Sequence, residues 1–158
     1  MSGIISDNQG RSSGLVKSAG GGGKVLQVLS ATDSTARSIG TSWTTGSNTL
    51  ACTITPSATS SKVLILCHTQ MYTGTNSSGF TINRDSTNLG HATYGMMYDG
   101  GYKSLVRVSI NYLDSPSSTS AIVYQLYAKS GATSYLNRGG SGTTYLPRAH
   151  ITVMEIGA

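Results

Sequence analysis

Apolar and polar residues alternate along most of the chain after residue 24, which is the pattern of β-strands with one buried face. Residues 49–55 (TLACTIT) alternate until Pro56 ends the segment. Residues 103–113 alternate in the same way, and the alternation resumes over residues 120–129 after the turn sequence DSPSSTS. No segment of useful length shows a helical period. The pattern therefore predicts an all-β domain.

The most apolar segment, residues 62–72 (KVLILCHTQMY), is expected to be a central strand buried on both faces. Residues 103–113 and 120–129 fit an antiparallel hairpin. Further strands are expected at residues 24–31, 78–84 and 149–156, with short ones near 88–92 and 134–138. Turn signals recur every 8–12 residues or so, which favours an antiparallel β-sandwich or barrel. Among these folds a jelly roll is preferred, while the strand order stays open.

Residues 1–23 differ from the rest of the chain and end in four glycines, Gly20 to Gly23. Glycine loses the most backbone entropy on ordering, so this segment is expected to be an extended arm that orders only on a partner. The residues expected to contact that partner are Ile4, Ile5, Arg11, Leu15, Val16 and Lys17. The sandwich domain is then residues 24–158.

Composition supports a small β-domain with a structural role. The chain has 158 residues, enough for one domain, and only 11% are charged, with Glu155 the one glutamate. The net charge is +5, but the eleven basic residues are spread singly, which is typical of a solvated surface rather than a nucleic-acid site. An acidic partner stays an alternative.

Neither a signal-peptide pattern nor an apolar run of about 20 residues is present, so we expect synthesis in a cytoplasm and no membrane partner.

Motifs for catalysis are missing from the sequence. There is no GxSxG nucleophile elbow and no HExxH zinc pattern, and His68, His91 and His150 are expected to be structural or surface residues. We therefore expect no enzyme activity, no metal and no cofactor.

The acidic residues and the cysteines also favour structural roles. Asp33, Asp85 and Asp114 occur in turn sequences, where aspartate caps local backbone N–H groups. Cys52 and Cys67 lie in apolar strands and are expected to be buried free thiols, although a bridge between neighbouring strands stays open.

The most distinctive local sequence is YGMMYDGGY at residues 94–102. Tyrosine and methionine are enriched at interfaces, so Tyr94, Met96, Met97, Tyr98 and Tyr102 are expected to form a contact loop for a neighbouring subunit or a surface ligand. The alternative is a loop folded over the open end of its own sandwich.

Several segments of the sequence resemble those of virion structural proteins of tailed phages, notably marine ones. They are MSGIISDNQGRSSGLVK, GGKVLQVLSATDST, ITPSATSSKVLILC, LDSPSSTSAIVYQLYAKSG, YLNR and ITVMEIGA, and together they cover most of the chain. The domains of such proteins are similar to the trimeric jelly rolls of the TNF and C1q kind. The resemblance implies a homotrimer packed around a three-fold axis, located in the virion.

Two roles follow as expectations from this resemblance. The first is a head decoration or cement protein that binds the capsid as a trimer through its arm. The second is a tail-fibre or tail-tip component that contacts a host-surface protein or glycan. A carbohydrate-active enzyme and a cellular C1q-like adhesive protein are disfavoured, the former because the aspartates occupy turn sequences and the latter because no signal peptide is visible.

Overall fold

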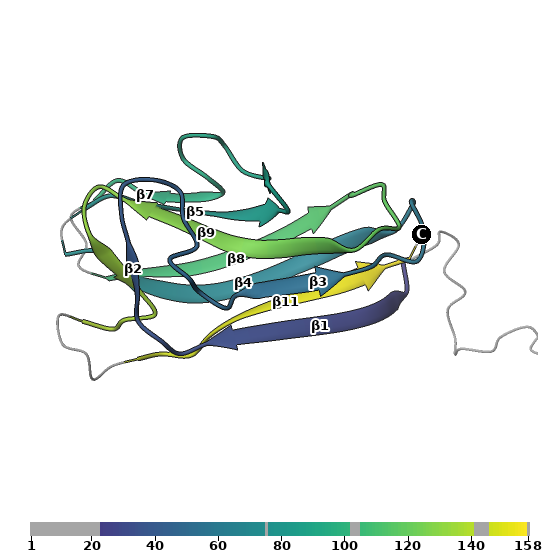
Figure 1. Ribbon diagram of the computed structural model, residues 1–158, viewed down its shortest axis with the longest axis horizontal. Coiled ribbons are helices and arrows are strands. Elements are labelled where there is room, and N and C mark those ends of the chain that lie inside the picture. Colours follow the sequence, from purple (N-terminus) through teal and green to yellow (C-terminus); the bar gives the residue numbers. More distant parts are fainter. Residues whose placement is uncertain (1–22, 75, 102–104, 141–145, 158) are drawn as a thin grey trace, which may run out of the picture.

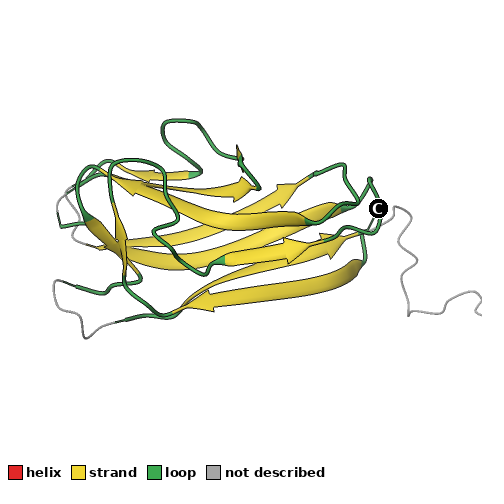
Figure 2. Cartoon of the chain, in the orientation of Figure 1, coloured by secondary structure: helices red, strands yellow, loops and turns green. Residues whose placement is uncertain are grey.

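The computed structural model describes residues 23–74, 76–101, 105–140 and 146–157. Within these ranges the regular structure is entirely β, as the alternating pattern predicted (Figures 1 and 2). The strands are β1 (Val25–Asp33), β2 (Arg37–Ile39), β3 (Ala51–Ile54), β4 (Lys62–Tyr72), β5 (Ser78–Arg84), β6 (Thr87–Asn88), β7 (Met97–Asp99), β8 (Leu105–Asp114), β9 (Ile122–Ser130), β10 (Ser134–Leu136) and β11 (Ala149–Ile156).

The strands form two antiparallel sheets that pack face to face as a sandwich. Sheet I has the order β8–β4–β11–β1, and the short strands β10 and β2 continue it from the end of β4. Sheet II has the order β3–β9–β5, and β6 and β7 both pair with the free side of β5. The predicted antiparallel β-sandwich is therefore confirmed.

The strand order is that of a jelly roll. Four antiparallel pairs are nested in the sequence: β1 with β11, β3 with β9, β4 with β8, and β5 with β7. Successive pairs alternate between the two sheets, so the chain forms a long hairpin that is rolled into a sandwich. The first and last strands, β1 and β11, lie side by side along one edge of the molecule (Figure 1).

The core lies between the inner faces of the two sheets, where every second residue is buried. Sheet I contributes Val63, Ile65, Cys67, Met71, Val108, Ile110, Ile151 and Val153, and sheet II contributes Cys52, Ile54, Phe80, Ile82, Tyr124 and Leu126. The alternation read from residues 49–55 and 103–113 thus marks the inward positions.

The prediction that residues 103–113 and 120–129 form a hairpin is wrong. Strand β8 pairs along its length with β4 in sheet I, whereas β9 pairs with β3 and β5 in sheet II. Residues 115–121 cross from one sheet to the other. Alternation reveals which face of a strand is buried but does not identify its partner, so sequence neighbours were paired by default.

The expectation that residues 62–72 are buried on both faces is also wrong. Strand β4 is central in sheet I, but only its inward residues are buried; Leu64 and Leu66 on its outer face are partly exposed, and His68 is exposed. Sheet II packs on one side of sheet I only. The apolar character of β4 therefore also supplies an outward-facing surface.

Three short strands complete the comparison with the sequence. Where a strand was expected near 88–92, the structure has the two-residue strand β6 (Thr87–Asn88), which overlaps that range only at Asn88. Strands β2 and β7, of three residues each, were not predicted. Strand β7 falls inside the segment interpreted as a loop, residues 94–102, and fixes part of it to sheet II.

Candidate functional site

The structure describes only part of the predicted contact residues. Ile4, Ile5, Arg11, Leu15, Val16 and Lys17 of the arm lie outside the described residues, as does Tyr102 of the contact loop. Tyr94, Met96, Met97 and Tyr98 are described. These four residues and the outer face of sheet I are the surfaces to consider.

The described part of the contact loop divides into an inward and an outward half. Met96 and Met97 are partly buried and pack against the core. Tyr94 and Tyr98 are about half exposed, with ring centroids 5.0 Å apart in an edge-on arrangement. The methionines therefore cover the domain's own core and the tyrosines face outward, whereas contact of this loop with a subunit or ligand stays a prediction.

The tyrosines are held by a dense set of backbone bonds. His91 and Gly95 exchange two backbone hydrogen bonds, and the amide of Met96 donates to the carbonyl of Phe80 on β5 at 2.8 Å. Gly95 has a φ of +71°, and a Cβ there would collide with the Phe80 carbonyl oxygen. The loop is therefore anchored to sheet II.

A row of apolar side chains crosses the outer face of sheet I. Val28 on β1 is in register with Met154 on β11, Met154 with Leu64 on β4, and Leu64 with Leu113 on β8. At the two ends of this apolar row, Val28 and Leu113 are 55% and 48% exposed. Since the row spans four strands, it is a continuous surface, and such patches mark interaction sites.

The apolar row has apolar neighbours toward the end of the sheet where β1 begins. Val25 is 55% exposed and lies in register with Ile156, and Leu26 is exposed beside Gly157. The sequence did not single out this surface. One sign of this surface was present in the sequence, because Leu64 and Leu66 alternate with the inward residues of β4. Both leucines were expected to be buried.

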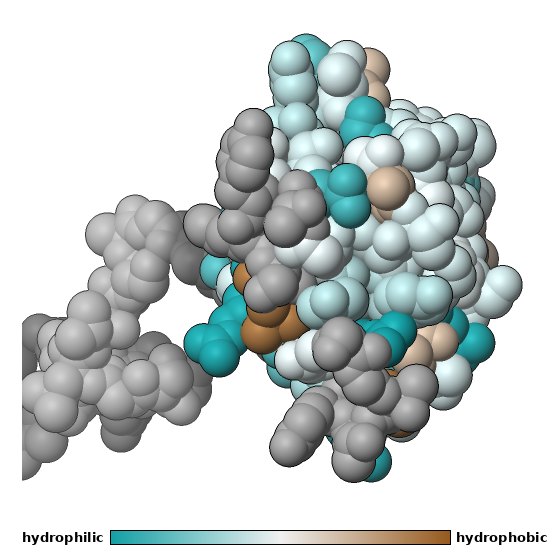
Figure 3. Space-filling model, turned by 90° about the vertical axis from the view of Figure 1, so that its left-hand side faces the viewer, coloured by the Kyte–Doolittle hydropathy of each residue, from teal (hydrophilic) through white to brown (hydrophobic). Residues whose placement is uncertain are grey.

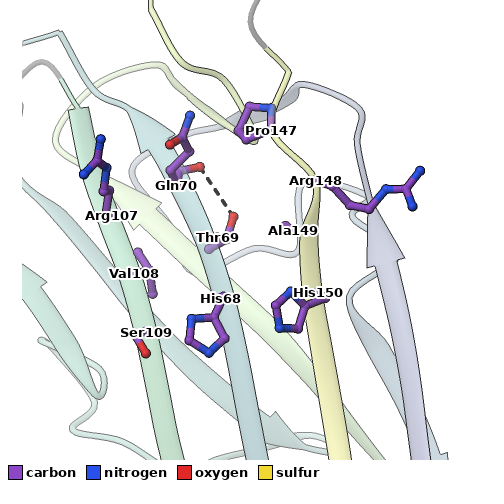
Figure 4. A pocket seen from close by; sticks show the side chains of 10 residues that line it. All are labelled: His68, Thr69, Gln70, Arg107, Val108, Ser109, Pro147, Arg148, Ala149 and His150. Atoms are coloured by element: carbon purple, nitrogen blue, oxygen red, sulfur yellow. Dashed lines mark hydrogen bonds between the residues drawn. The ribbon is translucent and has the colours of Figure 1, made fainter.

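The other half of the same face is polar and carries a shallow cavity of about 430 Å³ over β8, β4 and β11 (Figure 4). His68 and His150 are cross-strand partners in it, with ring centroids 4.9 Å apart. In Figure 4 the two rings lie side by side, Arg107 stands on β8 beyond them, and Arg148 points away. None of the described lining residues is acidic, and Arg107 and Arg148 give this cavity a positive charge.

The end of the sandwich near β2 and β7 has a different character. Viewed from that side in Figure 3, the described surface is mainly hydrophilic, and apolar colour is confined to small patches. The apolar row is therefore not part of a generally apolar surface. It is a local feature that calls for an explanation.

Buried carboxylates fasten the fold rather than face a cleft. Glu155 is 1% exposed, and its oxygens accept hydrogen bonds from the Ser57 hydroxyl and amide, the Gln27 amide and the Ser61 hydroxyl. The hydrogen bonds from Ser57, Gln27 and Ser61 outweigh the cost of burial and lower the pKa of Glu155 to about 2. It joins β11 to β1 and to the segment that precedes β4.

A second buried cluster joins the two sheets. Asp114 on β8 accepts two bonds from the Arg84 guanidinium of β5, at 2.9 and 3.1 Å, and one from the Tyr124 hydroxyl of β9 at 2.6 Å. Burial, and then the hydrogen bond to Asp114, raise the pKa of Tyr124. The prediction that Asp114 caps a local turn is therefore wrong, because its described partners are side chains of the opposite sheet.

The other two turn aspartates differ from each other. Asp33 is a turn cap as predicted, since its Oδ1 accepts the Thr35 amide at 2.8 Å. Asp85 occupies the turn with a φ of +52°, but its Oδ1 accepts the amide of Val123 on the neighbouring strand β9. Sequence context located the turn but not the bond.

The two cysteines are buried free thiols, as predicted. Burial raises the pKa of Cys67 to about 12 and also raises that of Cys52. Both side chains belong to the core between the sheets. Neither thiol is placed or ionised for chemistry.

No family model matches the chain, and no curated protein is significantly similar to it. In the described part of the chain, no helix has the length and apolar character to cross a membrane. The same residues contain no group of three or more histidine, cysteine or acidic side chains that could hold a metal ion.

Proposed function

We propose that this protein is a non-enzymatic structural subunit of a bacteriophage particle that assembles as a homotrimer through the outer face of sheet I. The observation that carries the proposal is the apolar row of Val28, Met154, Leu64 and Leu113. The resemblance to virion proteins with trimeric jelly rolls agrees with it, because that arrangement packs strand faces around a three-fold axis. Head decoration is the favoured role.

Self-association is the simplest way to cover the apolar row. A symmetric oligomer places the same patch of each copy against its neighbours, so one apolar surface is enough to close the assembly. Each apolar side chain that moves from half exposed to buried contributes on the order of 1 kcal/mol. Because the apolar row spans four strands, the sum of such contacts supports a stable interface.

The placement of the chain ends fits attachment through residues 1–23. Val25 is in register with Ile156, and the Gly157 amide donates to the Lys24 carbonyl, so the arm joins the domain where the chain also finishes. Figure 1 shows this end of the sandwich opposite the end that carries β7, the strand that contains Tyr98. An arm that grips the shell would thus leave the tyrosine end pointing outward.

The acidic residues support a structural rather than catalytic role. The carboxylates of Asp33, Asp114 and Glu155 are buried, and each accepts several hydrogen bonds from neighbouring strands or turns. Glycoside cleavage needs two carboxylates that face a shared substrate. These three are committed to holding the sandwich together.

Replacing two exposed residues of the apolar row tests the interface. Val28→Lys and Leu113→Lys place charges on a face that already carries Lys62 and two histidines, and both side chains are about half exposed, so the fold is retained. We expect a trimer for the parent protein and a monomer for the double variant in light scattering after size-exclusion chromatography. Val123→Lys, on the outer face of sheet II, is the matched control and should remain a trimer.

Two results would overturn this part of the proposal. One is a parent protein that stays monomeric at the highest concentration at which it is soluble. The other is a double variant that still forms trimers. Circular dichroism of all three proteins verifies that the sandwich is intact.

Deletion of residues 1–23 tests the attachment role separately. The truncated protein should fold and form a trimer, because the described sandwich and its apolar row lie outside the deleted segment. We expect it to lose binding to particles that lack the native protein. Occupancy equal to that of the full chain would show that the arm is not the attachment device.

A tail-fibre or tail-tip role is the second candidate, favoured by the half-exposed Tyr94 and Tyr98 at the end opposite the arm. Tyr98→Ala combined with Tyr102→Ala should then abolish adsorption to host cells and leave assembly intact. The number of copies per particle separates the two roles, since hundreds of copies indicate the head and a few tens or fewer the tail.

A further inference from the structure

A pocket of about 320 Å³ opens beside the exposed tyrosines, at the end of sheet II. It is formed where four segments meet: the loop after β2, the start of β5, the segment 93–98 and the end of β9. Its lining includes Thr41, Ser78, Thr93, Tyr94, Tyr98 and Lys129. The role of this pocket does not depend on the particle or on the trimer proposed above.

One side of the pocket is aromatic and held in place. Tyr94 packs edge-on against Tyr98 on one side and stacks on His91 on the other, with a centroid distance of 5.2 Å to the imidazole. The Nδ1 of His91 accepts the amides of Thr93 and Tyr94 at 3.1 and 3.2 Å. Both tyrosines nevertheless remain about half exposed, so a rigid aromatic surface faces outward at little entropic cost to a ligand.

Ser78 also belongs to the lining, but its side chain does not face the pocket. Ser78 lies on the same face of β5 as the core residues Phe80 and Ile82 and pairs with buried Ser130, and its Oγ is itself buried. The pocket therefore lies on the outer face of sheet II, where Gly79 of β5 is in register with Tyr98 of β7 and Lys129 of β9.

Among the described residues of the lining, Lys129 is the one cation. The Lys129 ammonium stands 4.9 Å from the centre of the Trp43 ring, and the Trp43 Nε1 donates to the Ala92 carbonyl at 2.8 Å. Trp43 in turn packs on Gly79, where a Cβ would lie 3.0 Å from the ring. None of the described residues that line the pocket is acidic. Asp99 lies next to Tyr98 in sequence, and its Oδ1 accepts the Gly101 amide at 3.0 Å.

We propose that this pocket binds a carboxylated hexose, a sugar of the uronic acid type. The apolar face of a pyranose ring packs on Tyr94 and Tyr98, as sugars do on exposed aromatic side chains. The carboxylate lies at the Lys129 ammonium. The threonine hydroxyls of the lining, Thr41 and Thr93, pair with ring hydroxyls.

The lining of the pocket favours a carboxylated sugar over the other ligands that aromatic surfaces bind. An apolar peptide side chain would gain nothing from Lys129 or from the threonine hydroxyls. A phosphate would use Lys129 but not the two tyrosine rings. A carboxylated pyranose uses the rings, the ammonium and the hydroxyls at once, and repeated copies in an assembly would raise its apparent affinity for a polysaccharide.

The test compares methyl glucuronide with methyl glucoside, which differ only in the carboxylate, by titration calorimetry or ligand-observed NMR with the full chain. We expect saturable binding of the glucuronide and about tenfold weaker binding of the glucoside. Lys129→Met keeps the apolar stem over Trp43 and removes the charge, so it should bring the two affinities to parity. Tyr98→Ala should weaken both by about tenfold.

Tyr112→Ala, an exposed tyrosine on β8 that does not line the pocket, is the control for Tyr98→Ala. The proposal is overturned by the absence of saturable binding, by equal affinity of the parent protein for both glycosides, or by binding that Tyr98→Ala leaves unaltered.

Discussion

Glu155 shows how one side chain can hold several parts of this fold. Its carboxylate lies 1% exposed in β11 and accepts bonds from Gln27, Ser57 and Ser61, which come from β1 and from the segment before β4. A buried charge is tolerated only when it is fully hydrogen-bonded, as this one is. The sequence drew attention to Glu155 because the chain has no other glutamate, but nothing in its neighbours AHITVMEI indicated these partners.

The lowered pKa of Glu155 predicts how stability depends on pH. Its pKa is about 2 in the folded protein and near 4.5 when unfolded, so the unfolded chain takes up the proton first as pH falls. The stabilisation is therefore complete above about pH 4.5 and is lost as the pH falls toward 2. Its size is on the order of 2 kcal/mol.

Glu155→Gln measures this contribution. In urea unfolding, the variant should have a free energy of unfolding roughly 2 kcal/mol lower than the parent protein near neutral pH. This difference, the gap between the two proteins, should narrow as the pH falls through 4.5 toward 2. Working with the difference between the two proteins cancels the titration of the other carboxylates. A gap that stays constant over this range would show that Glu155 is not the group that titrates.

At the scale of elements, alternation in the sequence predicted strands well and their pairing poorly. Residues 149–156 and 78–84 were located correctly, and Leu50, Cys52 and Ile54 are buried as their spacing implied. The partner of β8 was wrong, because an alternating strand looks the same whichever sheet it joins. Partner choice depends on distant residues that single-strand patterns do not contain.

Short elements and sites formed by several segments were beyond the sequence for a related reason. Strands β2 and β7 have three residues each, too few to show a period. The sequence identified Tyr94 and Tyr98 from local composition, but the pocket beside them also needs Gly79 and Lys129 from β5 and β9. Only the register of β5 with β9, in which Gly79 faces Lys129, brings these residues together.

The bond between Tyr124 and Asp114 gives a prediction about how β8, β5 and β9 are fastened. Tyr124→Phe keeps the buried ring and removes the hydroxyl that donates to Asp114 at 2.6 Å. Asp114 retains Arg84, so we expect a loss of about 1–3 kcal/mol in the free energy of unfolding, typical of one hydrogen bond to a charged group. Chemical denaturation measures it.

Tyr127→Phe is the matched control for this bond, since Tyr127 is in the same strand and its side chain is on the outer, partly exposed face. Its free energy of unfolding should change by less than about 0.5 kcal/mol. Equal effects of the two substitutions would show that the bond to Asp114 contributes nothing specific.

At the scale of the whole molecule, the jelly roll separates three surfaces on one small domain. The described domain begins at one end, the apolar row lies on the outer face of sheet I beside that end, and the tyrosine pocket opens at the opposite end. The attachment, self-association and ligand contact proposed above would thus use different residues. The arm over residues 1–23 stays a prediction, and the sequence could not show that the other two surfaces lie apart.

The two cysteines report on the opening of the whole sandwich. Cys52 projects inward from sheet II and Cys67 from sheet I, both are buried free thiols, and the pKa of Cys67 is raised to about 12. A thiol reagent needs the exposed thiolate, so labelling requires the two sheets to separate. Opening between sheets that share one core is global unfolding rather than a local motion.

We therefore expect both thiols to be labelled by iodoacetamide at one common rate, slowed relative to the unfolded chain by the unfolding equilibrium constant. The free energy calculated from that slowing should equal the value from urea unfolding. Glu155→Gln, which lowers stability by roughly 2 kcal/mol, should accelerate labelling of both cysteines about thirtyfold at neutral pH. Rapid labelling of either thiol in the native protein, or acceleration of only one of them, would mean that the sheets open separately from the fold as a whole.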